Sequence, residues 1–270
     1  ANVLLEIGDY RGARDAYRDV LALDPKHPEA NWNLGLVQLQ LGEWAEGWSQ
    51  YEWRLRQPGR KQVHRSRPRW DGRPLKGRRI LLDCEQGLGD ALQFVRFAPL
   101  VAERGGRVWI ECHAPLVHLF ERLSCVEGVT AKGQAPPDFD FHLPIMSLPF
   151  VLRVDDPGAV PSSPYIKPDA ELVELYKLRM MELARPWIGI TWSGNPELST
   201  NAKRSLTAGQ VTDLCDGMPG TWISLQKGVA SLPDRLISVE DGLASTMDHA
   251  AALIENLDLV ISVDTSIAHL

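Results

Sequence analysis

The chain has 270 residues, of which 44% are hydrophobic and 24% are charged, and its net charge is −6 at pH 7. This length exceeds one average domain, so the composition of an ordinary globular protein predicts two or three folded units. The negative charge argues against a nucleic-acid binder, and no apolar run approaches the roughly 18 residues that a membrane-spanning helix needs.

A repeat opens the chain. The motif Gly8-Asp9-Tyr10 recurs 34 residues later as Gly42-Glu43-Trp44, and Ala13 falls on Gly47 at the same offset. A period of 34 residues is that of the tetratricopeptide repeat, in which glycines lie at turns between paired helices. Residues 1–57 therefore resemble the tetratricopeptide family, and we expect helical hairpins there that can bind a protein partner.

One and a half repeats cannot bury a core alone, because each repeat packs on its neighbours. We expect either further repeats before Ala1 or packing of these helices on the next domain, since both ends of the sequence look like cuts in a longer chain. Four aromatic side chains are available for this packing: Trp44, Trp48, Tyr51 and Trp53. They could instead stack on sugar rings, but packing is the interpretation that we favour.

Residues 58–78 are predicted to be a basic linker rich in proline and glycine, in which Asp71 is the only acid. Proline excludes a regular helix, so we expect an extended connection. Two interpretations are open for its arginines: an arm that binds lipid phosphate or polyphosphate, and a solvated linker that lies over an acidic surface. We favour the solvated linker.

Apolar strands and amphipathic helices alternate from Arg79 onward. The expected strands are 80–84, 108–112, 139–143, 187–192, 222–225 and 259–263. The expected helices are 90–103, 116–123, 171–183, 208–215 and 246–257. This alternation predicts an α/β fold with parallel sheets and helices on both faces. We expect two Rossmann-like lobes, at residues 79–167 and 168–270, with ligands bound beyond the carboxyl ends of the strands.

The first expected strand runs into a glycine-rich loop with Gly87, Gly89 and Asp90. Glycines let the backbone approach a ligand closely, and the helix that follows offers free N–H groups. A dinucleotide fingerprint would need a third glycine where Leu92 stands, which argues against a dehydrogenase, and a phosphate loop would need a Gly-Lys-Ser/Thr ending. Asp90 is either a helix cap or a catalytic carboxylate.

Two stretches of the second lobe carry phosphate-binding chemistry. Ser193 follows a strand and precedes the basic pair Lys203-Arg204. Such cations neutralise phosphate oxygens, although a surface loop with two solvated cations is the alternative. The segment Asp264-Thr265-Ser266 follows the last strand and supplies hydroxyl and N–H groups at a helix start, where a phosphate or a simple cap would lie.

These blocks, in this order, resemble the heptosyltransferase-like glycosyltransferase family 9 over roughly residues 79–270. The resemblance implies a GT-B fold of two facing Rossmann-like lobes, here with the second lobe incomplete. It implies a metal-independent, inverting transferase that moves a sugar from a nucleoside diphosphate sugar to a glycan, lipopolysaccharide or protein acceptor, without a cofactor. A repeat ahead of a GT-B domain also looks like the protein O-GlcNAc transferases, but the motifs are nearer to the heptosyltransferase type.

The resemblance also assigns roles to residues. Asp90 matches the aspartate that acts as the base, and Lys203 or Arg204 matches the basic residue that binds phosphate. The block that binds the donor is Asp264, Thr265, Ser266 and His269, in which Ser266 stands where many members have glycine. Gln226 and Lys227 follow a strand where the family places an acidic contact to the sugar or ribose, so the resemblance does not extend to ADP-heptose as the donor.

A metal-dependent alternative comes from Asp138-Phe139-Asp140. In a strand, carboxylates two residues apart share one face and can reach one metal ion. Phe139 and Phe141 alternate on the other face, as in any half-buried edge strand, so we expect no metal site. The scattered cysteines, Cys84, Cys112, Cys125 and Cys215, have no metal-ligand spacing. They predict reduced thiols in a cytoplasmic protein. A lipid-linked acceptor would place this protein peripherally at the inner membrane face.

A second class of function is an interaction protein. In that case the repeats bind partners, and the α/β lobes are a degenerate transferase that serves as a scaffold. Binding of a nucleotide-sugar distinguishes the two classes.

Overall fold

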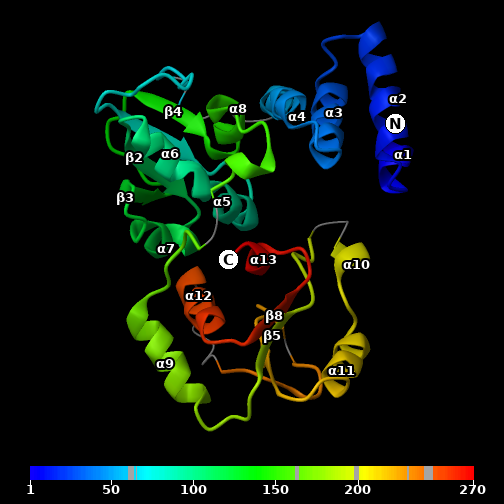
Figure 1. Cartoon of the computed structure of the whole chain (residues 1–270), viewed down its shortest axis with the longest axis vertical. Helices are drawn as coiled ribbons and strands as arrows, with labels where there is room; N and C mark the ends of the chain where they lie inside the picture. Colours follow the sequence, from blue (N-terminus) through cyan, green and yellow to red (C-terminus); the bar gives the residue numbers. More distant parts are fainter. Residues whose placement is uncertain (60–63, 65, 162–163, 198–200, 230, 240–245) are drawn as a thin grey trace. The chain divides into compact units, whose positions relative to one another are not determined.

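The computed structural model describes residues 1–59, 64, 66–161, 164–197, 201–229, 231–239 and 246–270. The chain divides into two compact units. The first unit comprises Ala1–Glu85, Arg96–Trp109 and Pro137–Ser162, and the second comprises Gln86–Val95, Ile110–Pro136 and Ser163–Leu270. Figure 1 colours the chain from blue at the N-terminus to red at the C-terminus.

The first unit begins with the helical hairpins that the 34-residue repeat predicts (Figure 1). The helices are α1 (Asn2–Glu6), α2 (Tyr10–Leu23), α3 (Pro28–Gln40) and α4 (Trp44–Tyr51), followed by the 3-10 helix η1 (Glu52–Arg56). α2 begins where the Asp9 carboxylate accepts a hydrogen bond from Gly12 N at 2.9 Å. The buried core of the hairpins consists of Ala13, Tyr17, Ala30, Leu34 and Val37.

α4 and η1 pack on the α/β part of the same unit. The Tyr51 hydroxyl lies 3.8 Å from Met146 Sδ. Arg54, whose side chain is fully buried, donates to Ser147 Oγ at 2.7 Å and to Glu85 Oε1 at 2.8 Å. The helices therefore pack on the domain that follows them, which is one of the two arrangements that the short repeat predicts.

Residues 60–63 and 65 of the predicted linker lie outside the described residues, but residues 66–78 are not the solvated connection that the arginines suggest. Trp70 is 2% exposed and Leu75 is fully buried. Trp70 N donates to His142 O at 3.0 Å, and Trp70 Nε1 donates to Arg73 O at 2.8 Å. The expectation is wrong here because burial of two large apolar side chains stabilises docking of the segment, while its described arginines, Arg67, Arg69, Arg73 and Arg78, remain exposed.

The first sheet has four strands in the order β3-β2-β1-β4. Their bounds are β1 (Arg79–Asp83), β2 (Arg107–Cys112), β3 (Val126–Ala131) and β4 (Phe141–Pro144). β1 and β4 are parallel, with Leu82 opposite Leu143. β2 passes from the first unit into the second between Trp109 and Ile110.

The helices around this sheet are short. They are α5 (Leu88–Phe94), α6 (Ala98–Glu103), α7 (Val117–Glu121) and α8 (Leu148–Leu152), with 3-10 turns η2 (Val95–Phe97), η3 (Ala114–Leu116), η4 (Ile145–Ser147) and η5 (Pro157–Ala159). The single helix expected over residues 90–103 is thus two helices joined by a 3-10 turn. Pro99, in the first turn of α6, accounts for the break, because proline has no N–H to continue the ladder of the preceding helix.

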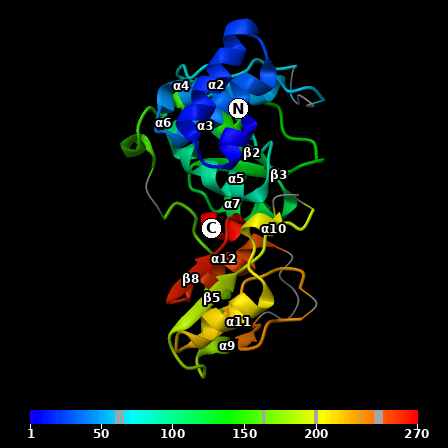
Figure 2. The same cartoon turned by 90° about the vertical axis from the view of Figure 1, so that its right-hand side faces the viewer.

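The second sheet is parallel and has the order β7-β6-β5-β8. Its strands are β5 (Trp187–Thr191), β6 (Thr221–Ser224), β7 (Leu236–Ile237) and β8 (Leu259–Ser262). α11 (Ala208–Asp216) covers one face, and α9 (Ala170–Met180) and α12 (Met247–Glu255) cover the other (Figures 1 and 2). The chain thus has the expected α/β fold, with helical hairpins ahead of parallel sheets.

Two further short helices complete the second unit, α10 (Asn201–Arg204) and α13 (Ser266–His269). In the same unit Arg122, at the end of α7, forms an ion pair with the buried Asp248 of α12. Among the helices in the described part of the chain, none is both long and apolar enough to cross a bilayer.

Candidate functional site

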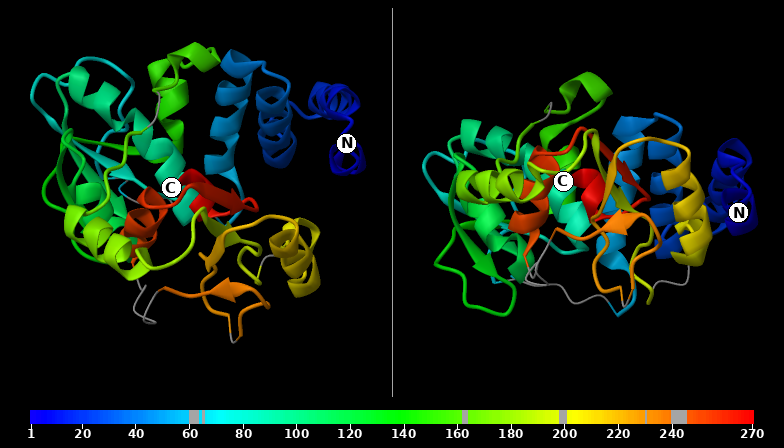
Figure 3. Two further views of the ribbon diagram at one scale, coloured as in Figure 1. Left: turned by 60° about the horizontal axis from the view of Figure 1, so that its bottom comes forward. Right: turned by 90° about the horizontal axis from the view of Figure 1, so that it is seen from below.

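The glycine-rich loop and the last helix meet in the second unit. A Cβ added at Gly89 would lie 3.0 Å from His269 Cδ2 and 3.5 Å from Ser266 Cα, so a larger residue at this position would require the His269 side chain to shift. Figure 3 shows α13 beside α5, near the C-terminus. The structure therefore brings together two of the blocks that the sequence singled out.

The Asp90 side chain bonds back to the start of its own helix. Its Oδ2 accepts a hydrogen bond from Gly87 N at 3.0 Å, and the side chain is half-buried. The N-cap position that the sequence left open for Asp90 is held by Gly87, because α5 begins at Leu88; Asp90 instead accepts the N–H of Gly87 from within the first turn. The bond occupies only one carboxylate oxygen, and an ionised carboxylate offers about four acceptor positions.

Two residues that the sequence analysis did not assign hold this region. The Tyr165 hydroxyl lies 2.9 Å from Leu92 O in α5 and 3.5 Å from His269 O in α13. His113 donates from Nε2 to Gln86 O at 2.5 Å, at the start of the loop. Tyr165 lies in an irregular stretch with no periodic pattern, so no local signal marks it.

Gln226 and Ser193 also come together, at the carboxyl ends of β5 and β6. Gln226 Oε1 accepts hydrogen bonds from Ser193 N at 2.9 Å and from Trp192 N at 3.2 Å. The amide oxygen of Gln226 therefore holds the loop after β5. The neighbouring Lys227 is exposed, and no side-chain partner of Lys227 is present in the described residues.

The Ser193 hydroxyl is the centre of a small polar cluster. Asn201 Nδ2 donates to Ser193 Oγ at 3.2 Å, and Ser205 Oγ donates to the same atom at 3.2 Å. Gly194 N donates to Asn201 Oδ1 at 2.9 Å. Asn201 was not predicted as part of the site. Its position just before the basic pair is the one sequence signal for it.

Of the basic pair, Arg204 makes the contacts. Arg204 Nη1 lies 3.1 Å from Asp264 Oδ2, and a Cβ added at Gly194 would lie 2.6 Å from Arg204 Nη2. The guanidinium therefore lies directly over the glycine backbone and connects the loop after β5 to the loop after β8. Lys203 is exposed on α10, and its side chain forms no hydrogen bond or ion pair with the other candidate residues in the described part of the chain.

The start of α13 follows β8 directly. Thr265 precedes the helix in extended backbone, and its side chain makes no capping hydrogen bond. Its Oγ1 lies 3.2 Å from Ser262 Oγ instead. The N–H groups at this helix start thus have no side-chain cap from Thr265, which is the arrangement that an anion uses at a helix N-terminus.

The paired aspartates of the metal-dependent alternative do not lie in a strand, because β4 begins at Phe141. Asp140 Oδ2 accepts a hydrogen bond from Arg79 N at 2.9 Å, and Asp138 Oδ1 lies 3.2 Å from Arg67 Nη2. The expectation of one shared strand face is therefore wrong. Asp140 instead bonds to the first residue of β1, and Asp138 interacts with the segment that precedes β1.

Comparisons with known proteins agree with this architecture. Residues 1–52 match the family model described as Tetratricopeptide repeat. The chain is 27% identical over 258 residues to Protein FlbA of Caulobacter vibrioides, with 83% of this chain and 43% of that relative covered, so it spans less than half of the relative's length. Its structure is similar to the crystal structure of the glycosyl transferase family 9 from Veillonella parvula DSM 2008, with a TM-score of 0.51, 11% identity, and 70% of this chain and 76% of that chain covered. The chain thus joins a tetratricopeptide repeat to an α/β region with the fold of a family 9 glycosyl transferase.

Proposed function

We propose that the protein is a glycosyltransferase that moves a sugar from a nucleoside diphosphate sugar to an acceptor hydroxyl, with inversion and without a metal ion. The observation that carries this proposal is the close approach of Gly89 to Ser266 and His269. It places the helix that bears Asp90 next to the helix start that would receive a phosphate. The similarity to a family 9 glycosyl transferase supports the class of reaction.

Asp90 is the proposed base. It takes the proton of the acceptor hydroxyl as the hydroxyl oxygen attacks the anomeric carbon, and the bond from that carbon to the diphosphate oxygen breaks. Its hydrogen bond to Gly87 N fixes the side-chain conformation and leaves one oxygen for the acceptor. Positioning of this kind is a large part of what a catalytic carboxylate contributes.

Arg204 and the N–H groups at Thr265 and Ser266 are the proposed stabilisers of the leaving diphosphate. Arg204 is already held at the carboxyl end of the sheet by Asp264, which is 76% exposed. Because an exposed ion pair is worth only about 0–1 kcal/mol, Arg204 can exchange Asp264 for a phosphate at little cost. Charge-assisted bonds to the phosphate are stronger than the pair they replace.

Four other residues have supporting roles in this proposal. Ser193 supplies the loop that borders the diphosphate, Gln226 fixes that loop, and Lys203 and Lys227 add positive charge at the rim. The acceptor is a hydroxyl of a glycan, a lipid-linked sugar or a protein. We place the reaction in the cytoplasm, at the inner membrane face when the acceptor is lipid-linked.

The test compares Asp90→Asn with the wild-type chain. Asparagine keeps an oxygen that can accept the Gly87 hydrogen bond but is not a base at neutral pH. We expect transfer to fall by on the order of 10²- to 10⁴-fold, with donor affinity unchanged. Asp138→Asn, which alters an exposed carboxylate of the first unit, is the matched control. Full transfer by Asp90→Asn would remove Asp90 from the mechanism.

A scaffold function is the second candidate, and one observation favours it. Large apolar side chains are exposed on the first helices and their turns, among them Val3, Ile7 and Leu23. Val3 and Ile7 are four residues apart at α1 and so share one face, and neighbouring exposed apolar side chains offer a surface to a protein partner. If a panel of ADP-, GDP- and UDP-linked sugars produces no thermal stabilisation, the scaffold replaces the transferase, since a ligand of the folded state must stabilise it.

A further inference from the structure

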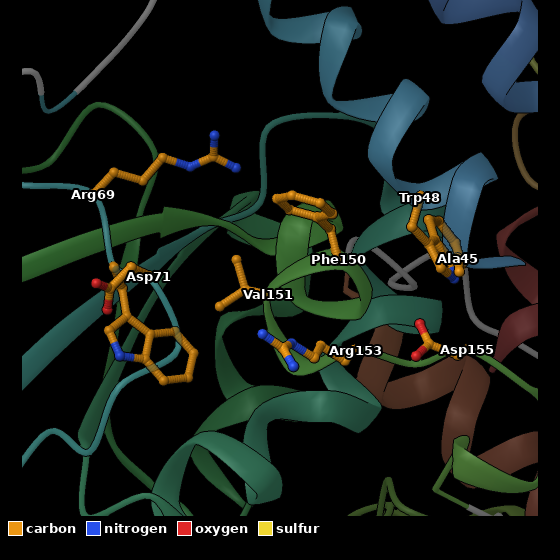
Figure 4. A pocket seen from close by; sticks show the side chains of 9 residues that line it. Ala45, Trp48, Arg69, Asp71, Phe150, Val151, Arg153 and Asp155 are labelled. Carbon is orange, nitrogen blue, oxygen red and sulfur yellow. The ribbon is translucent and has the colours of Figure 1, made fainter.

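A pocket of about 530 Å³ lies in the first unit, where the repeat meets the α/β part. Helix α4 contributes one side, the segment Arg69–Asp71 a second, and α8 with the loop after it a third. Figure 4 shows these side chains around the pocket. The volume is within the range of about 300–1,000 Å³ that small-molecule sites occupy.

Two aromatic rings border this pocket from different elements. Trp48 lies on α4 and Phe150 on α8, and Figure 4 shows both rings at the pocket. The Trp48 ring is fixed by edge-to-face packing against Tyr51, with ring centroids 5.9 Å apart. Phe150 is 42% exposed, which leaves a large aromatic surface in solvent. The fixed ring of Trp48 and the exposed ring of Phe150 offer faces on which a ligand with an apolar side can stack.

The charged side chains that line the pocket are two cations and two anions, so their charges sum to zero. They are the guanidinium groups of Arg69 and Arg153 and the carboxylates of Asp71 and Asp155. Arg69 is held in an ion pair with Glu52, and Asp71 accepts a hydrogen bond from Arg73 N at 3.1 Å.

Arg153 and Asp155 form no side-chain hydrogen bond or ion pair within the described part of the chain, so their polar groups are available to a ligand. A charged ligand would meet a like charge in this pocket. A hydroxyl both donates and accepts, so it matches guanidinium and carboxylate groups together. A neutral ligand with several hydroxyl groups and one apolar face therefore fits the pocket best.

We propose that this pocket binds a neutral sugar unit of the acceptor glycan, with the ring stacked on Trp48 and Phe150 and its hydroxyls bonded to Arg153, Asp71 and Asp155. The choice of an acceptor glycan rests on the proposed transferase function, whereas sugar binding as such does not. Because α4 supplies one wall, the repeat takes a direct part in the choice of acceptor.

The experiment titrates the whole chain with maltose, lactose, cellobiose and the methyl glycosides of glucose, galactose and mannose, followed by saturation-transfer NMR and calorimetry. We expect at least one of these to bind with a Kd of about 1 mM or tighter. Phe150→Ala and Asp155→Asn should each weaken binding at least tenfold. Both positions are exposed, so the variants should fold. Leu178→Ala and Glu171→Gln, exposed positions of α9, should bind like the wild type.

The outcomes separate this proposal from the transferase. Absence of binding across the saccharide panel, or unchanged binding by Phe150→Ala, would overturn the sugar pocket. A parallel titration of the Phe150→Ala variant with nucleotide-sugars reports on the proposed donor site of the second unit, because the sugar of the donor could otherwise enter the pocket. If the chain binds saccharides but no nucleotide-sugar, the sugar pocket is supported and the transferase proposal is wrong. If it binds a nucleotide-sugar but no saccharide, the transferase proposal is supported and the sugar pocket is wrong.

Discussion

Truncation of Arg54 tests the buried ion network that joins the repeat to the α/β part. Arg54 is fully buried and donates to Glu52 Oε1 at 2.7 Å and to Glu85 Oε1 at 2.8 Å. The two carboxylate side chains are only 14% and 7% exposed. Arg54→Ala leaves both without their shared cation, and breaking a buried pair in this way costs about 3–5 kcal/mol. Since whole domains are stable by about 5–15 kcal/mol, we expect a large loss in the free energy of unfolding.

Urea unfolding, followed by tryptophan fluorescence, measures this loss. Arg73→Ala, which removes an exposed cation paired with Asp71, is the control and should change little. Arg54→Met combined with Glu85→Gln should be less destabilised than the sum of its single changes, by about 1–3 kcal/mol, because residues in one network couple. A loss below about 1 kcal/mol for Arg54→Ala, or strictly additive changes, would refute this reasoning.

Three further predictions concern single residues. Gly89→Val should lower the free energy of unfolding, measured in urea, by about 1–3 kcal/mol, because the valine side chain would collide with His269. Gly209→Ala is the control and should change this free energy little, because the space around its Cβ is open. Burial raises the pKa of Cys112 to about 12, so iodoacetamide at about pH 8 should leave Cys112 unmodified in the folded protein, as mass spectrometry would report; rapid modification would contradict this. Burial alone would raise the pKa of Glu52, but Arg54 and Arg69 together outweigh it and hold the pKa below the ordinary value of 4.5. The stability that Glu52 contributes is therefore present above pH 4.5 and lost as the pH falls through the folded-state pKa, and Glu52→Gln should flatten the acid limb of the unfolding free energy.

The parts of the fold that follow from local pattern could be predicted from the sequence. The 34-residue repeat predicts the hairpins, and the alternation after Arg79 predicts parallel sheets with helices. Local pattern fails where one residue decides the geometry, as at Pro99, which divides the expected helix over residues 90–103. It also fails where apolar residues are few, as in the basic segment that buries Trp70.

The candidate site was predictable only in part, because local patterns in the sequence do not show which distant residues meet. The sequence singled out Gly89 and His269 as separate blocks, and their contact is a tertiary feature that no local spacing encodes. Tyr165 bridges α5 and α13 from an irregular segment, and the Arg54 bond to Glu85 joins distant parts of the chain. Such contacts depend on how elements pack, and one sequence does not specify that packing through local patterns.

Calorimetric titration of the chain with ADP-, GDP- and UDP-linked sugars tests the central claim most directly. We predict that one of these donors binds and that Arg204→Ala weakens its binding at least tenfold, since a bond to a charged phosphate is worth about 1.5–3 kcal/mol. Lys177→Ala, which removes an exposed cation of α9, should bind the donor like the wild type. Absence of binding across the panel, or equal affinity in the Arg204 variant, would contradict the proposed donor site.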